Sequence, residues 1–260
     1  MSTTLTLFRK ELRSYFSTPF GWVILTFVLV LQGVSLSYTL KLFRDTPQKE
    51  GLLFTILHAP VFWFYFLFIF PLLTMKTFAE EEKTGTLETL LTAPVKTGQV
   101  VIAKYLASYT FYIFLWLPLL LYPFISDGAN ALASAVQHTQ SSMFITYPLQ
   151  DIVGCYSILL LMGSWFTALG VLASSLTSSQ IISGIITVGL LVLTFFMGIV
   201  PIVWGEFPAS SAFHYVSSME HMDTFTQGLI DSRPIVFYIS ATILTLAITA
   251  RIVDHRRWTH

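Results

Sequence analysis

Long stretches of apolar residues, separated by short polar segments, dominate the chain. A helix that spans a membrane needs about 20 predominantly apolar residues, and six stretches meet or nearly meet this length. They cover approximately residues 20–42, 53–78, 100–125, 152–172, 181–204 and 234–253. The pattern predicts an all-α integral membrane protein with six transmembrane helices, which form a single membrane domain over residues 20–253.

Composition agrees with this prediction. Of the 260 residues, 54% are apolar and only 11% are charged, whereas about 25% of the residues in an ordinary soluble domain are charged. Cys155 is the only cysteine, so an intrachain disulfide and a cysteine-based metal cluster are excluded.

Basic residues cluster at alternate ends of the predicted spans. On one side lie Arg9, Lys10, Arg13, Lys76, Lys83, Lys96, Lys104, Arg251, Arg256 and Arg257, and on the other lie Lys41, Arg44, Lys49 and Arg233. Because basic residues accumulate in cytoplasmic loops, both termini are predicted to be cytoplasmic. Long outer loops are then expected at residues 126–151 and 205–233, with a cytosolic tail at residues 254–260.

Residues 1–19 form a separate predicted element, an amphipathic helix that ends at Pro19. Leu5, Phe8, Leu12 and Tyr15 or Phe16 recur at helical spacing, while Arg9, Lys10 and Arg13 occupy other faces. Such a helix is expected to lie on the inner leaflet. Contact with a cytosolic partner is an alternative that the pattern leaves open.

The most informative polar segment is residues 78–95, between the second and third spans. Gly85 is expected to break the preceding helix or to let the chain reverse. Leu87, Leu90 and Leu91 then share one face of a short helix that Pro94 ends. A helix this short is not stable alone in water, so its apolar face is expected to bind a protein groove or the membrane interface. Glu80, Glu81 and Glu82 are expected to be solvated or paired with a basic partner.

Signatures of catalysis are lacking in the sequence. There is no Gly-Lys dipeptide and therefore no Walker A phosphate loop, and no common hydrolase or metalloprotease motif occurs. The span interiors hold almost no ionisable residues, which argues against ion-coupled transport. Residues of metal-ligand type gather only at His214, Glu220, His221 and Asp223, where a polar outer helix is favoured over a metal site.

Prolines and small residues inside the spans predict helix kinks and close helix packing. Pro71 and Pro118 should kink their helices, with a hinge role as the alternative. Small residues should let helices approach closely. We expect these contacts to lie within the chain, with a subunit interface as the alternative. The small residues are Gly163, Gly170, Ser174, Gly184 and Gly189.

Several stretches, in order, resemble one family, the type-2 ATP-binding-cassette permeases, particularly those of gliding motility and nitrous oxide reductase maturation. They are FRKELRSYFSTPFGWV at residues 8–23, FAEEEKTGTLETLLTAPV at 78–95, SSLTSSQII at 174–182 and FTQGLIDSRPIVFYIS at 225–240. Family members often have Arg where Gln227 stands, which weakens a charge role at that position.

The resemblance implies an exporter-like permease subunit that works as a dimer with separately encoded ATPase subunits in a bacterial inner membrane. Such a permease would bind no cofactor directly, because the ATPase holds ATP and Mg. Its expected partners include membrane lipid but no nucleic acid. The loop between spans two and three would carry a cytosolic coupling helix. Carried over by residue, the ATPase-coupling site comprises Glu80, Glu81, Glu82, Gly85, Thr86, Leu87, Glu88, Leu90, Leu91 and Pro94.

Two other functions remain as alternatives. The chain could transmit ATPase motion to an assembly or motility machine without transporting anything, or it could be an intramembrane enzyme, which the lack of buried polar constellations disfavours. Substrate identity is open. The aromatic residues Phe62, Trp63, Tyr65, Phe66, Trp116 and Phe195 would suit a cavity for lipidic cargo, but aromatic side chains also fill membrane-protein cores.

Overall fold

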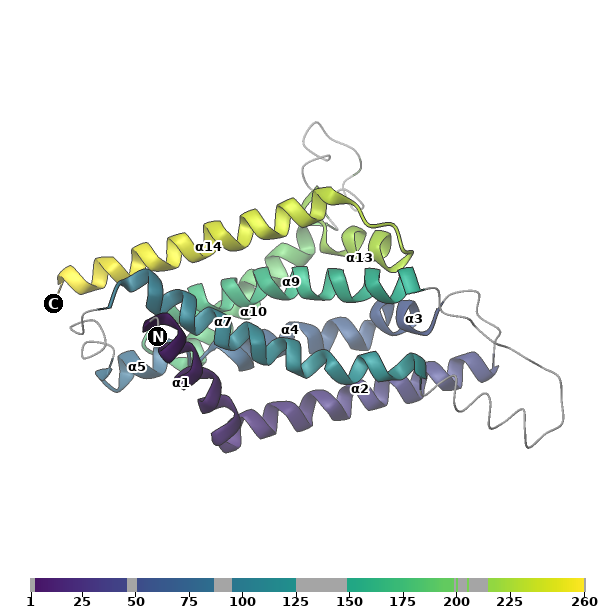
Figure 1. Cartoon of the computed structure of the whole chain (residues 1–260). Helices are drawn as coiled ribbons and strands as arrows, with labels where there is room; N and C mark the ends of the chain where they lie inside the picture. Colours follow the sequence, from purple (N-terminus) through teal and green to yellow (C-terminus); the bar gives the residue numbers. More distant parts are fainter. Residues whose placement is uncertain are drawn as a thin grey trace.

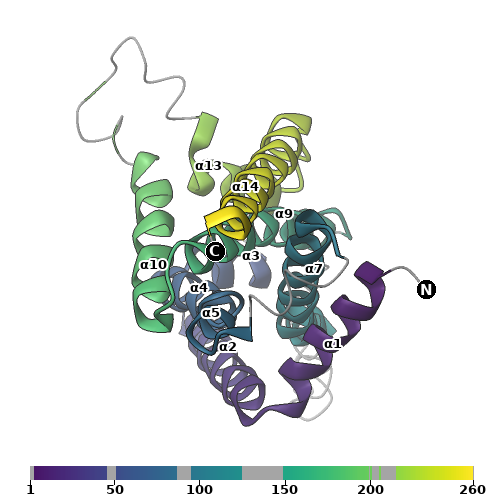
Figure 2. The ribbon, with the colours of Figure 1, turned by 90° about the vertical axis from the view of Figure 1, so that its left-hand side faces the viewer.

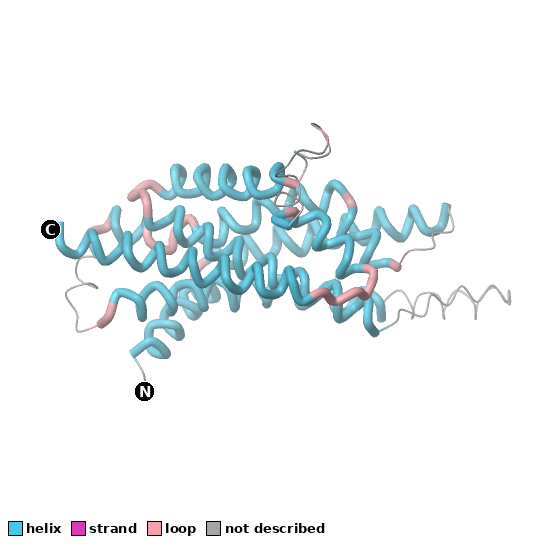
Figure 3. Tube along the Cα trace, turned by 90° about the horizontal axis from the view of Figure 1, so that it is seen from above, coloured by secondary structure: helices cyan, strands magenta, loops and turns pink. Residues whose placement is uncertain are grey.

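A computed structural model describes residues 3–45, 51–86, 95–124, 149–198, 200, 205 and 215–259. Within these residues every regular element is a helix, and the helices form one elongated bundle (Figure 1). Both termini and the short helix α5 lie together at one end of the bundle, which we call the α5 end (Figures 1 and 3). Helices α3 and α13 lie near the opposite end, the α13 end (Figure 1).

The chain begins with two helices that meet at an elbow, α1 (Thr3–Ser17) and α2 (Pro19–Asp45). A side chain at Gly21 is impossible in this geometry, because an added Cβ would lie 1.8 Å from the carbonyl oxygen of Tyr15. Pro19 begins α2 rather than ending α1, as its fixed φ and missing N–H favour at a first helical position.

The second predicted span is a bent pair of helices in the structure. It consists of α3 (Leu52–His58) and α4 (Pro60–Thr74), which are bent by 66° at their junction. The cause is Pro60, which restricts Ala59 to an extended conformation (ψ 135°) and ends α3. Pro71, where a kink was predicted, lies inside α4.

The middle of the chain contains α5 (Ala79–Lys83), α7 (Thr97–Trp116) and the 3-10 helix η1 (Leu117–Leu121). Pro118 occupies the first turn of η1, so it changes the helix type at the end of the third predicted span. The remaining helices are α9 (Leu149–Ser175), α10 (Gln180–Met197), α13 (Ser218–Thr226) and α14 (Ser232–Thr259).

Helix α9 is the centre of the bundle, in contact with α3, α4, α7, α10, α13 and α14. Seen from the α5 end, α10 lies at one side of the bundle and α1 at the other (Figure 2). Among the described residues, four helices are long and apolar enough to span a membrane: α2, α7 with η1, α9 and α14. If the bent pair α3 and α4 counts as one span, the number of candidate spans is five. Helix α10 is apolar but shorter. Six spans therefore remain a prediction.

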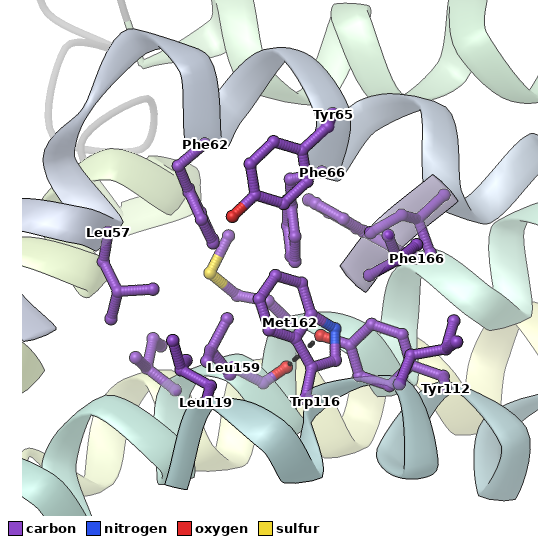
Figure 4. Close-up of a cluster of buried hydrophobic side chains, with 14 of the residues drawn as sticks. Leu57, Phe62, Tyr65, Phe66, Tyr112, Trp116, Leu119, Leu159, Met162 and Phe166 are labelled. Carbon is purple, nitrogen blue, oxygen red and sulfur yellow. Dashed lines mark hydrogen bonds between the residues drawn. The ribbon is translucent and has the colours of Figure 1, made fainter. Parts of the chain in front are cut away.

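Aromatic side chains from α4, α7 and α9 build the core (Figure 4). Phe62 and Phe66 pack on Trp116 with ring centroids 5.6 and 5.9 Å apart. The Tyr112 hydroxyl donates a hydrogen bond to the Leu159 carbonyl at 2.9 Å. Because these rings are almost completely buried, they fill the bundle rather than line a cargo cavity.

Two of the predicted close approaches occur inside the chain. An added Cβ would lie 2.1 Å from the Tyr112 ring at Gly163 and 2.1 Å from the Thr74 hydroxyl at Gly170, so α9 packs tightly on α7 and α4 at these points. At Gly184 and Gly189 an added Cβ would meet no described atom within 4 Å. Close approach within the chain is therefore confirmed at Gly163 and Gly170, whereas Gly184 and Gly189 of α10 have no described neighbour at this distance.

Candidate coupling site

Helix α5 is held in place by a side chain from another helix. The backbone N–H groups of Phe78 and Ala79 both donate to the Ser174 hydroxyl oxygen of α9, at 3.0 and 3.1 Å. The Ser174 hydroxyl in turn donates to the Met75 carbonyl at 3.4 Å. Since the first N–H groups of a helix have no partner within it, Ser174 serves as an N-cap supplied by a residue 96 positions away.

A buried lysine joins α5 to two other helices. Lys104 of α7 is 3% exposed, and its ammonium lies 2.8 Å from Glu81 of α5 and 3.4 Å from Glu11 of α1. The same ammonium lies 5.3 Å from the centre of the Phe78 ring. A buried ammonium is costly unless it is paired, so Lys104 holds α1, α5 and α7 in one arrangement.

The last helix is tied to the same end of the bundle. Arg256 of α14 forms an ion pair with Glu82 of α5, and the Asp254 carboxylate accepts a hydrogen bond from the Thr97 hydroxyl of α7 at 3.0 Å. Contacts of α5 therefore reach α1, α7, α9 and α14, and α5 also packs near α10.

Helix α1 lies against α7 and is fixed by one tyrosine. The Tyr15 hydroxyl donates to the Leu73 carbonyl and shares a hydrogen bond with the Ser108 hydroxyl, both at 2.9 Å. Its ring stacks on Phe111 with centroids 4.8 Å apart. Arg9, Lys10 and Arg13 are exposed, as expected from the sequence.

The chain matches the family described as ABC-2 family transporter protein over residues 5–253, which is nearly its whole length. It belongs to the ABC-2 transporter family. A comparison with curated proteins finds no significant match. The permease is thus a multi-pass membrane component of an ATP-binding-cassette transporter.

The residues expected to couple the permease to its ATPase divide into two groups. Glu80, Glu81, Glu82, Gly85 and Thr86 are described, whereas Leu87, Glu88, Leu90, Leu91 and Pro94 lie outside the described residues. Gly85 has φ +70° directly after α5, which confirms the predicted helix break because this conformation favours glycine.

The three glutamates have different surroundings in the permease. Glu80 is exposed, while Glu81 and Glu82 pair with basic groups of the same chain, Lys104 and Arg256. The side chains of Glu81 and Glu82 are only 18% and 30% exposed. Their basic partners are therefore internal, so the acidic run serves largely to dock α5 on the bundle.

Four residues of this site were not predicted from the sequence: Lys104, Glu11, Ser174 and Arg256. The available signal was the position of Lys104 inside the third predicted span, because an ionisable residue within a span is by default a candidate functional residue. Its partners Glu11 and Glu81 lie 93 and 23 positions away along the chain, so the sequence alone did not indicate that they meet.

The polar cluster near the α13 end forms packing contacts. His221 is 7% exposed and bonds to the Tyr238 hydroxyl at 3.1 Å, and burial lowers the pKa of the His221 imidazole. Asp223 lies 3.5 Å from the His58 ring of α3, while His214 lies outside the described residues. Within the described part of the chain no group of three such side chains could hold a metal ion.

Proposed function

We propose that this permease receives the motion of a separate ATP-binding-cassette ATPase through residues 78–95. The observation that carries the proposal is the set of contacts around α5: Ser174, Lys104 and Arg256 tie it to α9, α7 and α14, and Glu11 of α1 shares Lys104. A displacement applied to the loop after α5 would therefore be passed to several helices together. ATP and Mg would be held by the ATPase.

Orientation follows from the charges at the α5 end. Exposed Arg9, Lys10, Arg13 and Lys83 lie on the elements gathered there, which favours a cytoplasmic location for this end and both termini. In this arrangement the chain has six spans, with α1 on the inner leaflet, in a bacterial inner membrane. Likeness to the permeases of gliding motility or nitrous oxide reductase maturation stays a prediction from sequence.

A second copy or a paralogue is the other proposed partner. Gly184 and Gly189 leave open space along α10, and Ile181, Ile185 and Leu193 on the same helix are 58–75% exposed. Small residues allow close helix contacts in membranes, so this face is our candidate for the dimer contact.

Export of a substrate is the function we favour, and transmission of ATPase motion to an assembly or motility machine is the alternative.

The decisive experiment is purification of the tagged permease from its native membrane, followed by mass spectrometry of the bound proteins. Wild type should retain an ATPase subunit. Leu90→Asp should lose at least about tenfold of it, because a leucine buried in a groove contributes about 1.5–3 kcal/mol. Glu82→Gln should change retention little, because a partly exposed ion pair contributes about 0–1 kcal/mol.

Leu229→Asp is the matched control, since Leu229 is an exposed leucine three residues after the end of α13, and it should keep the ATPase. Full retention by Leu90→Asp together with loss in Glu82→Gln would show that an ionic contact dominates. The absence of any ATPase from the wild-type complex would contradict the proposal. Vectorial movement of a substrate, measured with the intact complex, separates export from the mechanical alternative.

A further inference from the structure

A cavity of about 300 Å³ lies at the α5 end between α1, the start of α2, the end of α4 and α7. Phe20, in the first turn of α2, and Leu73, in the last turn of α4, form apolar parts of its wall. Trp22, two residues further along α2, is 56% exposed, and its indole N–H donates to the Phe16 carbonyl at 3.0 Å. Exposed tryptophans at span ends mark the membrane interface, so the cavity lies at headgroup level.

The cavity contains a cation, Lys76, that has no carboxylate partner among the described residues. The Lys76 ammonium lies 4.0 Å from the centre of the Phe20 ring, and no carboxylate of the described residues is within salt-bridge distance of it. Lys104, in contrast, is already paired with Glu11 and Glu81. An anionic group in the cavity would therefore be attracted to Lys76.

The same cavity also has acceptor oxygens without a partner among the described residues. Glu80 lines the cavity and forms no ion pair with a described residue. Glu81 pairs with Lys104 through one carboxylate oxygen, while its other oxygen, Oε2, is buried without a hydrogen-bond partner. The Thr77 hydroxyl, on a residue that is 8% exposed, has no hydrogen bond of good geometry either. Buried polar groups usually have hydrogen-bond partners in native proteins, so these two atoms are available to a ligand that enters the cavity.

A ligand with separate negative and positive ends satisfies both sets of groups. We propose that the cavity binds the zwitterionic headgroup of phosphatidylethanolamine, with its phosphate beside Lys76 and its ammonium beside Glu80. Phosphatidylglycerol supplies the phosphate but no cation. Phosphatidylcholine supplies a cation that cannot donate N–H hydrogen bonds to a carboxylate. The proposal depends on the membrane location of the chain and not on ATPase coupling.

Native mass spectrometry of the full chain, with the three lipids at equal acyl-chain composition, tests the site. Wild type should bind phosphatidylethanolamine up to about fivefold more tightly than the other two, because Glu80 is exposed and an exposed ion pair contributes about 0–1 kcal/mol. Lys76→Gln should weaken all three lipids alike, because they share the phosphate. Glu80→Gln should lower the affinity for phosphatidylethanolamine to that for phosphatidylcholine and leave phosphatidylcholine unchanged.

Lys83→Gln is the control for charge, since Lys83 is exposed on α5 but does not line the cavity, and it should behave as wild type. Equal or tighter binding of phosphatidylglycerol would overturn the proposal in favour of a simple anion site. Unchanged lipid affinities in both Lys76→Gln and Glu80→Gln would overturn it altogether.

Discussion

At the scale of single residues, Lys104 has the largest expected effect on stability. Its ammonium is buried between Glu11 and Glu81, and removal of one partner from a buried ionic group typically costs about 3–5 kcal/mol. Lys104→Met should destabilise the permease by about 3 kcal/mol, the lower limit, because both glutamates keep some exposure. Thermal or denaturant unfolding in detergent measures this, with Lys83→Met as the exposed-lysine control.

The triple variant Lys104→Met, Glu11→Gln, Glu81→Gln separates charge from shape. It removes all three charges while it retains similar volumes, so it should recover most of the lost free energy of unfolding. A triple variant as unstable as Lys104→Met would show that packing, and not unpaired charge, causes the loss.

His221 provides a prediction about pH. Burial lowers the pKa of this imidazole, opposed by Glu220 and Asp231, so the folded protein holds the neutral form more strongly than the unfolded chain does. Between the unfolded pKa of about 6.5 and the lower folded value, the unfolded state binds more protons, so stability falls as pH falls, by at most about 1.4 kcal/mol per pH unit.

Comparison of unfolding temperatures at about pH 7.5 and about pH 5.5 tests this expectation, because the interval includes the ordinary histidine pKa. His221→Gln should reduce the loss of stability on acidification. An equal loss in wild type and His221→Gln would place the responsible group elsewhere.

At the scale of elements, the position of α13 depends on one glycine of α9. An added Cβ at Gly154 would lie 2.0 Å from the Phe225 carbonyl oxygen. To avoid this clash α13 would have to move outward, although His221, Met222 and Phe225 are among its buried residues. Gly154→Ala should therefore destabilise the permease by about 1–3 kcal/mol, the usual cost of overpacking.

Gly33→Ala is the control, because an added Cβ there meets nothing within 4 Å. It should be neutral or slightly stabilising, by about 0.5–1 kcal/mol, since alanine favours a helix over glycine. Unfolding measurements on both variants, with limited proteolysis near α13, check the prediction. Equal stability of the two variants would contradict the packing argument.

At the scale of the whole molecule, the testable property is orientation in the membrane. Single cysteines at Lys83, Ser134 and Met219, in a Cys155→Ser background, should be labelled differently by an impermeant thiol reagent. Met219 is 39% exposed, which makes it a better position than its buried neighbour Ser218. The reagent should reach positions 134 and 219 from outside, and position 83 only after the membrane is permeabilised. Labelling of position 83 in intact cells would reverse the assigned orientation.

Apolar patterning determined the helical class, the approximate limits of the long helices and the break at Gly85, because these depend on local composition and backbone preference. The sequence also contained Pro60, but the second apolar stretch continues across it, so periodicity alone did not reveal the bend. The sequence likewise showed Glu81 and Glu82 as part of an acidic run. It did not indicate that their basic partners belong to the same chain.

Only the tertiary structure decided which distant residues meet. Ser174 caps α5, Lys104 pairs with Glu11 and Glu81, and Arg256 pairs with Glu82. These contacts join residues far apart in sequence, and they form because the packing of α1, α7, α9 and α14 leaves unpaired polar groups at one end of the bundle, where each must find a partner in three dimensions. Hydrophobic periodicity is a property of each segment by itself and carries no information about such pairs.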